Sequence, residues 1–510
     1  MLNYFWGKGP KGPEMGQEEK GKAGDSDTSV GSGSPAADPA EELKSAANEA
    51  FKDHKFAHAV DLYTQALEIR SDNAILYANR AFAHIKLEEY GSAVEDASKA
   101  IEIDPLYPKG YYRRGSAYVA LGKFKDALKD FRQVAKIRPR DPDAQKKLKE
   151  CEKAVQKLRF EEAIAQEEQD HPSVAETIDV SSMEVEPAYD GPRLEGDQLT
   201  LEFVKEMLET FKKQKKLHRR YAFQILLQIR EMLKSTPTLV DVTIAPGAHF
   251  TVCGDVHGQF YDLLNIFELE GLPSLENPYL FNGDFVDRGS FSVEVIFTLF
   301  AFKCLYPTGL YLSRGNHESR SMNKIYGFDG EVKAKYSDNM AELFAEVFCA
   351  LPLAHLLNNK VLVVHGGLFS QDGVKLDDIR KIDRFREPPD EGLMCELLWS
   401  DPKPGTGRSP SKRGVGVAFG EDVTKAFLED NRLDLIVRSH EVKEEGYEIE
   451  HDGKLVTVFS APNYCDQMGN KGAFIRFKSD MKPKYTKYSA VPHPNVRPMA
   501  YANNFLNFLS

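Results

Sequence analysis

A period of 34 residues between about residues 40 and 142 is the feature that most constrains how this chain can fold. Four columns of residues repeat at this spacing: Ala47, Ala81 and Gly115; Phe56, Tyr90 and Phe124; Ala59, Ala93 and Ala127; Ile69, Ile103 and Ile137. Small residues let two helices approach closely, and aromatic residues fill the space that remains. Pro105 and Pro139 close two of the units. The period therefore predicts three stacked helical units that share one core.

This pattern resembles the tetratricopeptide repeat, which implies an all-α superhelix over residues 40–142. An unrelated helical bundle is the alternative, but a chance period would not keep several columns in one register. A Lys- and Glu-rich helix over residues 143–169 is expected to cap the repeats. Residues 1–39 are rich in Gly, Ser, Pro and charged residues, a composition that predicts a disordered tail.

The acidic balance of the chain limits the classes of function. Its 510 residues carry 66 basic and 78 acidic side chains, and the net charge of −12 argues against a nucleic-acid-binding protein. No apolar run approaches the roughly 18 residues of a membrane-spanning helix, and the first residues lack the apolar core of a signal peptide. The six cysteines lie far apart, so reduced thiols and a cytoplasmic and nuclear location are expected. Acidic residues concentrate over residues 170–198, which predicts a solvated linker.

From about residue 199 the pattern changes to α/β. Two helical stretches, 201–213 and 221–233, precede short apolar runs at 250–253, 279–281, 310–312, 361–364 and 433–437. Oxygen and nitrogen donors follow these runs: Asp255 and His257; Asp284, Asp287 and Arg288; Asn316 and His317; His365; and His440. Because ligands gather beyond the carboxyl ends of strands in α/β sheets, the five ends can converge on one site. Carboxylate, amide and imidazole ligands suit Mn, Fe or Zn better than Ca²⁺ or a structural zinc.

Together these clusters resemble the metal-dependent phosphoesterases and, more narrowly, the PPP family of serine/threonine protein phosphatases. The family signatures GDxHG, GDxVDRG and GNHE stand intact at residues 254–258, 283–289 and 315–318. The loop SAPNYC at residues 460–465 is similar to that of the protein phosphatases and unlike that of the related nucleotide hydrolases. The resemblance implies an α/β metallophosphoesterase sandwich over residues 199–492, with the tetratricopeptide repeats ahead of it.

The resemblance also implies metal ligands. One divalent ion would be held by Asp255, His257 and Asp284, and a second by Asp284, Asn316, His365 and His440. Asp284 is then the bridging ligand. The two ions, Mn, Fe, Zn or Mg, would share a hydroxide whose pKa both cations lower, and this hydroxide would attack phosphorus.

The remaining motif residues are expected to handle the phosphate and the leaving group. Arg288 and Arg413 would bind the phosphoryl oxygens, since guanidinium groups form bidentate contacts well. The resemblance adds Asn316, His440 and Tyr464 to the phosphate-binding groups. A serine or threonine alkoxide needs a proton as it leaves, which His317 can donate if Asp287 fixes its tautomer.

Five polar residues of the repeats share one helical face: Lys44, Asn48, Asn79, Lys109 and Arg113. Their positions in the repeat units span roughly 100° of that face. This set resembles the carboxylate clamp by which tetratricopeptide domains hold the acidic C-terminal tails of heat-shock chaperones. An ordinary solvated face is the alternative.

The C-terminal tail, residues 493–510, is expected to form a short apolar helix, because Ala502, Phe505, Leu506 and Leu509 follow the spacing i, i+3, i+4, i+7. In the resembled phosphatases the repeats and the terminal helix hold the catalytic cleft closed. That resemblance places Glu88 opposite the metal site as an autoinhibitory carboxylate. Alternatively, Glu88 is a solvated loop residue and the terminal stripe only packs on the catalytic domain.

The expected function is a serine/threonine phosphoprotein phosphatase whose repeats recruit chaperone-type partners and restrain the active site. Two other functions stay open. A catalytically silent scaffold would have lost ligands, and all six are present. A phosphodiesterase or nucleotide hydrolase is disfavoured by the loop at residues 460–465 and by the repeats.

Overall fold

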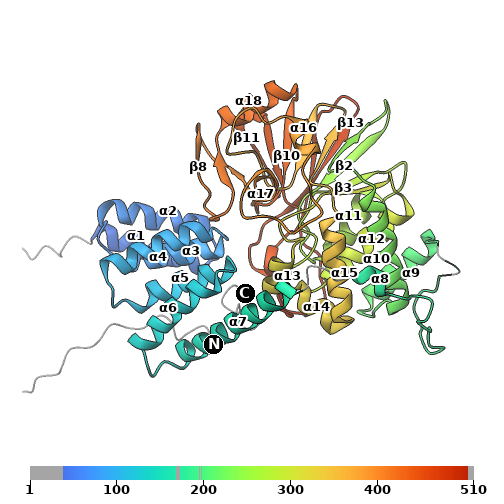
Figure 1. Cartoon of the computed structure of the whole chain (residues 1–510). Helices are drawn as coiled ribbons and strands as arrows, with labels where there is room; N and C mark the ends of the chain where they lie inside the picture. The colour runs from blue at the N-terminus through green and yellow to red at the C-terminus, as the bar shows by residue number, and fades with distance from the viewer. Residues whose placement is uncertain (1–37, 168–172, 195, 197, 503–510) are drawn as a thin grey trace, which may run out of the picture. The chain divides into compact units, whose positions relative to one another are not determined.

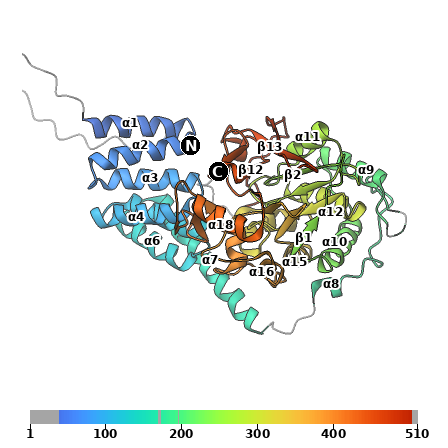
Figure 2. The same ribbon diagram turned by 90° about the horizontal axis from the view of Figure 1, so that it is seen from above.

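The protein is described here by a computed structural model, which covers residues 38–167, 173–194, 196 and 198–502; for residues 157–167 only the backbone is described. The repeats form successive antiparallel helix pairs, as the period predicts. The helices are α1 (Pro39–Lys52), α2 (Phe56–Ile69), α3 (Ala74–Lys86), α4 (Tyr90–Ile103), α5 (Pro108–Ala120) and α6 (Phe124–Ile137). Figure 2 shows α1 to α4 side by side in chain order. A long helix, α7 (Pro142–Glu167), follows and packs on α6.

The small-residue columns of the period lie in the core of the repeats. Ala47, Ala59, Ala81 and Ala93 are fully buried, whereas Ile69 is 53% exposed because it ends its helix. A further column appears only in the structure: Arg80 pairs with Asp96 through two hydrogen bonds of 2.8 and 2.6 Å. The same pairing recurs 34 residues later between Arg114 and Asp130, at 2.9 and 2.8 Å.

The catalytic part is a sandwich of two sheets. Among the described residues one sheet has the order β1-β5-β6-β10-β12-β11 and the other β14-β13-β2-β3-β4. The strands are β1 (Leu239–Val242), β2 (His249–Cys253), β3 (Tyr279–Phe281), β4 (Leu310–Leu312), β5 (Ala354–Leu357), β6 (Val361–Val364), β10 (Leu435–Arg438), β11 (Tyr447–Glu450), β12 (Leu455–Val458), β13 (Gly472–Lys478) and β14 (Lys484–Tyr488). A small sheet of β7 (Asp401–Pro402), β9 (Val417–Phe419) and β8 (Arg408–Pro410) lies apart.

Helices cover the outer face of each sheet (Figure 1). On the side of β2 and β3 lie α9 (Leu201–Lys212), α10 (Arg219–Lys234), α11 (Phe260–Glu270), α12 (Ser292–Leu305), α14 (Phe328–Lys335) and α15 (Asp338–Cys349), with α13 (Arg320–Tyr326) next to the site. On the side of β6 and β10 lie α16 (Leu376–Arg380), α17 (Leu393–Trp399) and α18 (Glu421–Asn431). Between the sheets, Val252, Leu280, Val363 and Val437 form one buried cluster.

Of the predicted solvated linker over residues 170–198, the structure describes residues 173–194, 196 and 198; the acidic residues there are exposed, and apolar residues between them pack on the catalytic part. Ser173 and Val174 donate hydrogen bonds of 2.5 and 2.7 Å to Glu346, and α8 (Val174–Thr177) follows. Ile178, Val180, Met183, Val185 and Tyr189 then pack against the main catalytic core. The charge count predicts the exposed acidic residues of the segment but not the partly buried apolar residues between them.

The ends of the chain are described only in part. Of the predicted C-terminal stripe, Ala502 packs in one cluster with Met499 and residues of the repeats, while Phe505, Leu506 and Leu509 lie outside the described residues. Residues 1–37 of the predicted tail also lie outside them.

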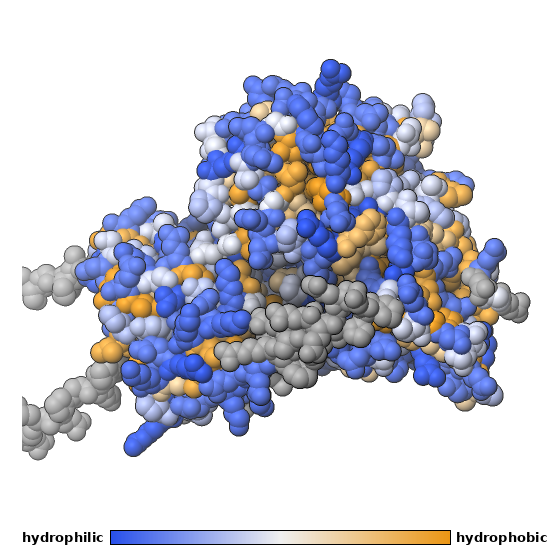
Figure 3. Space-filling view, in the orientation of Figure 1, coloured by the Kyte–Doolittle hydropathy of each residue, from blue (hydrophilic) through white to orange (hydrophobic). Residues whose placement is uncertain are grey.

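Within the described ranges, no helix combines the length and the apolar character that crossing a membrane requires. Polar side chains dominate the face shown in Figure 3.

Candidate metal and phosphate site

The polar residues of the predicted site lie in loops that follow β2, β3, β4, β6 and β10. Because β2, β3 and β4 are parallel, as are β6 and β10, the carboxyl ends meet at one edge of each sheet. Several residues here take left-handed backbone, with φ of 41° at His257, 50° at Asp284 and 71° at His440. Strain of this kind in residues other than glycine collects at sites where a side chain must point in one direction.

These loops bring most of the predicted site residues to one cavity of about 250 Å³. Its lining includes Asp255, His257, Asp284, Arg288, Asn316, His317, Arg413, His440 and Tyr464. His365 lies next to this group, since its Nε2 is 2.9 Å from Oδ1 of Asn316. The five strand ends therefore meet at a single site.

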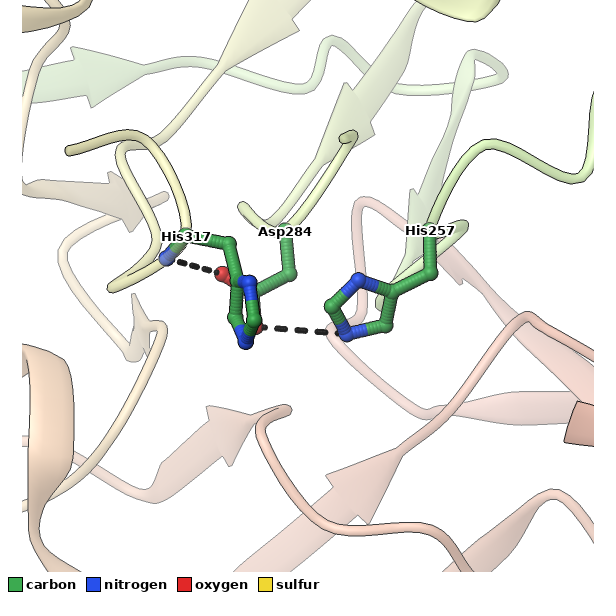
Figure 4. Close-up of side chains that lie close together, drawn as sticks. All are labelled: His257, Asp284 and His317. Carbon is green, nitrogen blue, oxygen red and sulfur yellow. Dashed lines mark hydrogen bonds and ion pairs between the residues drawn. The ribbon is translucent and has the colours of Figure 1, made fainter. Parts of the chain in front are cut away.

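Asp284 lies at the centre of the group. Its Oδ2 is 3.5 Å from Nε2 of His257 and 3.3 Å from Nε2 of His365. Figure 4 shows the His257 ring on one side of the carboxylate and the backbone N–H of His317, which donates to Oδ1 at 2.9 Å, on the other. Donor atoms of His257, Asp284 and His317 all lie within 4.8 Å of one another, as do those of Asp284, His365 and His440. Asp284 belongs to both groups, at the position predicted for a bridging ligand.

The backbone around Asp284 is held by Glu318. This fully buried carboxylate accepts hydrogen bonds of 2.8 Å from the N–H groups of Asp284 and Gly315, and of 2.9 Å from that of Phe285. Glycine is required at position 315, because a Cβ there would lie 2.2 Å from Oδ1 of Asp284. The last residue of the GNHE signature thus ties two of the five loops together.

Two histidines are oriented as metal ligands by the groups behind them. Nδ1 of His257 is 2.9 Å from the carbonyl oxygen of Val286, and Nδ1 of His365 is 2.8 Å from that of Asn282. A carbonyl oxygen only accepts, so Nδ1 carries the proton in both rings and Nε2 presents a lone pair. Both Nε2 atoms face Asp284.

The charges of the site fit divalent cations. Burial raises the pKa of Asp255 to about 8 and raises that of Asp284 well above its usual range, because ionised carboxylates are costly away from water. Burial also lowers the pKa of His440 well below its usual value, and its Nε2 has no hydrogen-bond partner among the described residues. A bound cation would compensate the carboxylates and use the free nitrogen. The oxygen and nitrogen donors suit metals of the Mn, Fe and Zn type.

The two predicted phosphate-binding arginines lie on the wall of the cavity. The guanidinium of Arg288 stacks 3.8 Å over the ring of Tyr326, and its buried Nε has no partner among the described residues. Arg413 donates from Nε to Asp401 at 2.6 Å and from a terminal nitrogen to the carbonyl oxygen of His440 at 2.7 Å. Although burial opposes it, Arg413 and Arg438 hold the pKa of Asp401 below its usual value.

His317 and Asp287 form the pair that was predicted for proton donation. Nδ1 of His317 lies 2.8 Å from Oδ2 of Asp287, and Asp287 is fully buried. Burial raises the pKa of Asp287 to about 8 and lowers that of His317 well below its usual value. The hydrogen bond places Nε2 of His317 as the atom free to exchange a proton.

Comparisons with known proteins agree with this geometry. Residues 248–444 match the family of calcineurin-like phosphoesterases, 74–105 and 108–141 match tetratricopeptide repeats, and 148–241 match the PPP5 TPR repeat region. Relatives named serine/threonine-protein phosphatase 5 are 63% identical in Solanum lycopersicum and 64% in Arabidopsis thaliana, over 92% of this chain and 98% of each relative. The corresponding protein of Homo sapiens is 57% identical over 92% of this chain and 94% of its own length.

The chain belongs to the serine/threonine-protein phosphatase 5 family. The structure of a serine/threonine phosphatase from Saccharomyces cerevisiae, 45% identical, covers 59% of this chain and 100% of its own with a TM-score of 0.58. The predicted family, the predicted fold class and the enzyme class, a metal-dependent phosphoprotein phosphatase, are thereby confirmed.

In this member of the phosphatase 5 family Glu88 contacts residues that are predicted to bind phosphate. It stands in the loop between α3 and α4 with a φ of 63°, and its carboxylate is 2.7 Å from Arg288. The hydroxyl of Tyr464 donates to the same carboxylate oxygen at 3.4 Å. A carboxylate from the repeats thus contacts two groups predicted to bind phosphate.

The five predicted clamp residues all lie on helices of the repeats. Asn79 donates to Oδ1 of Asn48 at 3.4 Å, and Tyr63 donates to the same oxygen at 2.6 Å. Burial lowers the pKa of Arg113 to about 10, and burial together with Arg113 lowers that of Lys109. Lys44 forms an ion pair with Glu41. The structure thus brings Asn48 next to Asn79 and Lys109 near Arg113, and the clamp itself stays a prediction.

Sequence reasoning missed three residues that act on the site of this family member. Asp401, which holds Arg413, stands in no signature. Glu318 stands in one, but the signature does not reveal what it holds. Lys86 lines the cavity, and burial, with smaller contributions from Arg113 and Arg288, lowers its pKa to about 8.

Proposed function

We propose that this chain hydrolyses phosphoserine and phosphothreonine in proteins at a centre of two divalent metal ions, and that its own repeats restrain this activity. The observation that carries the proposal is the meeting of Asp284 with two histidines oriented as ligands, beside the buried Arg288 and the half-buried Arg413. A phosphate monoester and divalent cations are the ligands that such a set of charges recognises.

The predicted ligands supply enough donors for two ions. Asp255, His257 and Asp284 would hold one, and Asp284, Asn316, His365 and His440 the other. Ions bound there would supply a water molecule acidic enough to attack at neutral pH and positive charge beside the phosphoryl oxygens. The donor types favour Mn, Fe, Zn or Mg, and metal analysis of protein purified without added metal would identify them.

The chain's own residues would bind the phosphate and deliver the proton. Arg288 and Arg413 hold phosphoryl oxygens, with Asp401 fixing the plane of Arg413. As the bond between phosphorus and the serine oxygen breaks, its electron pair stays on oxygen, and Nε2 of His317 donates the proton that neutralises it. Asp287 accepts the Nδ1–H of His317 and stabilises the charged ring before transfer.

The position of Glu88 supports restraint by the repeats. Its carboxylate is an anion, as a phosphate is, and it contacts Arg288 and Tyr464, so substrate must displace it. Contacts next to it hold the loop in place: Lys412 pairs with Glu89 at 3.0 Å and accepts a hydrogen bond from Ser92 N–H at 3.0 Å. A carboxylate on the same chain acts at high effective concentration. Low basal activity follows, rising when the repeats engage a ligand.

The clamp supports a partner with an acidic C-terminus, and the tails of heat-shock chaperones have that chemistry. Lysine and arginine side chains with two amides can hold both a terminal carboxylate and an acidic side chain. The cytoplasmic and nuclear location stays a prediction that imaging of the tagged chain would test.

Two substrates test the function most simply. Hydrolysis of a phosphoserine peptide and of a dinucleotide is measured on metal-loaded full chain with and without an acidic C-terminal peptide. We expect turnover of the phosphopeptide only. Preference for the dinucleotide would favour a phosphodiesterase, and inactivity on both with full metal content would favour a scaffold.

A further inference from the structure

The carboxylate of Asp287 accepts hydrogen bonds from other groups besides His317. Its Oδ2 lies 2.8 Å from Nδ1 of His317 and accepts a second hydrogen bond, of 3.0 Å, from Nδ2 of Asn323. Its Oδ1 accepts the backbone N–H of Phe328 at 2.9 Å. The aspartate is therefore fixed in plane and direction by groups from α13 and from the start of α14.

Asn323 also contacts the other member of the pair. The same Nδ2 donates to the carbonyl oxygen of His317 at 2.7 Å, and the side chain is 94% buried, since only 6% of the residue is exposed. The carbonyl oxygen of His317 cannot donate, so the amide must present its NH₂ group to it. One side chain thus joins the carboxylate of Asp287 to the backbone of His317.

We infer that Asn323 is a positioning residue for proton donation by His317. Two hydrogen bonds to one carboxylate oxygen aim Asp287 at Nδ1 of His317, which leaves Nε2 of the ring for the leaving oxygen. The bond to the carbonyl oxygen ties the same amide to the backbone of His317. Asn323 does not line that cavity, so it acts through the pair and not on substrate. This inference rests on the proposed role of His317.

The readout must separate positioning from a general loss of structure. A series of substituted phenyl phosphates varies the pKa of the leaving group at nearly constant size, so any restraint by the repeats affects all members equally. Where a general acid protonates the leaving oxygen, the rate depends weakly on that pKa; where the acid is impaired, the poorest leaving groups lose most.

The experiment compares full-length chain loaded with Mn²⁺ in four variants. Asn323→Leu keeps the shape and removes both donors. Asn323→Ser is the milder change, His317→Asn removes the acid, and Ile325→Val is the control on the same helix. We expect Asn323→Leu to lower kcat by about 10- to 100-fold on the poorest leaving group and little on the best, with KM and metal content unchanged.

We also expect Asn323→Ser to show a smaller change of the same kind, and Ile325→Val to match the natural chain. Equal losses across the series, or a loss of bound metal, would overturn the inference in favour of a structural role, and so would an unchanged slope. If His317→Asn also leaves the slope unchanged, the acid role itself fails. If only His317→Asn steepens the dependence of the rate on the pKa of the leaving group, the proposed function stands and Asn323 is dispensable.

Discussion

Two groups of cations on this chain, in the catalytic cavity and in the predicted clamp, are expected to bind anions. They differ in whether a carboxylate of the chain itself already contacts them. In the catalytic cavity Arg288 and Arg413 face Glu88 and Asp401 at 2.7 and 2.6 Å. Burial opposes their charge, but these carboxylates hold the pKa of both arginines above the usual value. In the clamp, burial lowers the pKa of Arg113, and tyrosines are what oppose it.

The difference shows that the arginines of the cavity already have carboxylate partners, whereas the cations of the predicted clamp would gain one from a ligand. An arginine that faces a carboxylate of its own chain is stable as it stands, and a phosphate must compete for it. Half-buried cations such as Lys109 and Arg113, which lie close enough for Arg113 to lower the pKa of Lys109, favour binding of an acidic ligand from outside.

The strongest way to break this comparison is to remove an arginine from each site. Arg288→Ala should lower kcat/KM on a phosphoserine peptide on the order of 10² to 10³, because it removes donors from the developing charge on phosphate. Arg113→Ala should leave kcat/KM without added peptide unchanged. Steady-state assays on both full-length variants check this. A similar loss in both would mean that the two sites are not separate.

Arg113→Ala should instead weaken the clamp. Loss of one half of a charge-assisted contact costs about 1.5 to 3 kcal/mol, which is about a 10- to 150-fold loss of affinity for a peptide ending in Glu-Glu-Val-Asp. Calorimetry measures it, with Lys129→Ala, a change at an exposed lysine of α6, as the control. Unchanged affinity for the peptide would favour the alternative, in which the five polar residues of the repeats form an ordinary solvated face.

The carboxylates predicted to bind metal offer a similar comparison with opposite charges: they are buried anions that a cation would compensate. Asp255, with a pKa of about 8, keeps its proton in the folded chain between pH 4 and 8 and loses it in the unfolded chain. The folded state binds more protons, so the free energy of unfolding falls as pH rises, by up to about 1.4 kcal/mol per pH unit for one such group.

Metal cations replace these protons, so the gain in Tm on adding Mn²⁺ to chelator-treated protein should grow from pH 6 to pH 8.5. Calorimetric scans with and without Mn²⁺ check this. A gain in Tm that is independent of pH would show that the buried carboxylates are not what the metal compensates.

A smaller effect is expected where Gly91 of the repeats packs against the backbone of Gly414, next to Arg413. A Cβ at Gly91 would lie 2.6 Å from the backbone nitrogen of Gly414, so Gly91→Ala must push the two backbones apart. We expect basal kcat/KM to rise severalfold without loss of Tm, since alanine favours the helix. Ser92→Ala, which keeps the backbone contact, is the control. Unchanged activity would show that this contact does not restrain the site.

The sequence predicts those parts of the molecule that repeat or that stand in signatures. The 34-residue period gives α1 to α6, and the motifs after the strands give the ligands around Asp284. Arg80 and Asp96 obey the same period, but the pattern does not reveal that a pair 16 residues apart is in contact. Asp401 could not be found, because only the packing of the small sheet brings it to Arg413.

Two further features depend on tertiary packing. The apolar residues of the acidic segment are ordinary in number, and they are partly buried only because the segment packs against the main catalytic core. Asn323 carries no mark in the sequence, because its importance arises from where α13 places its amide. In both cases the local sequence permits the contact without specifying it.

The central claim is that Glu88 occupies the phosphate site in place of substrate. The most direct test measures kcat/KM of full-length Glu88→Gln on a phosphopeptide without any activator, beside the natural chain and Glu95→Gln, a change at an exposed glutamate of α4. The amide keeps the shape and removes the charge that holds Arg288. The account predicts high activity in Glu88→Gln that added acidic peptide raises no further, and natural activity in Glu95→Gln. Equal, low activity in all three would contradict it.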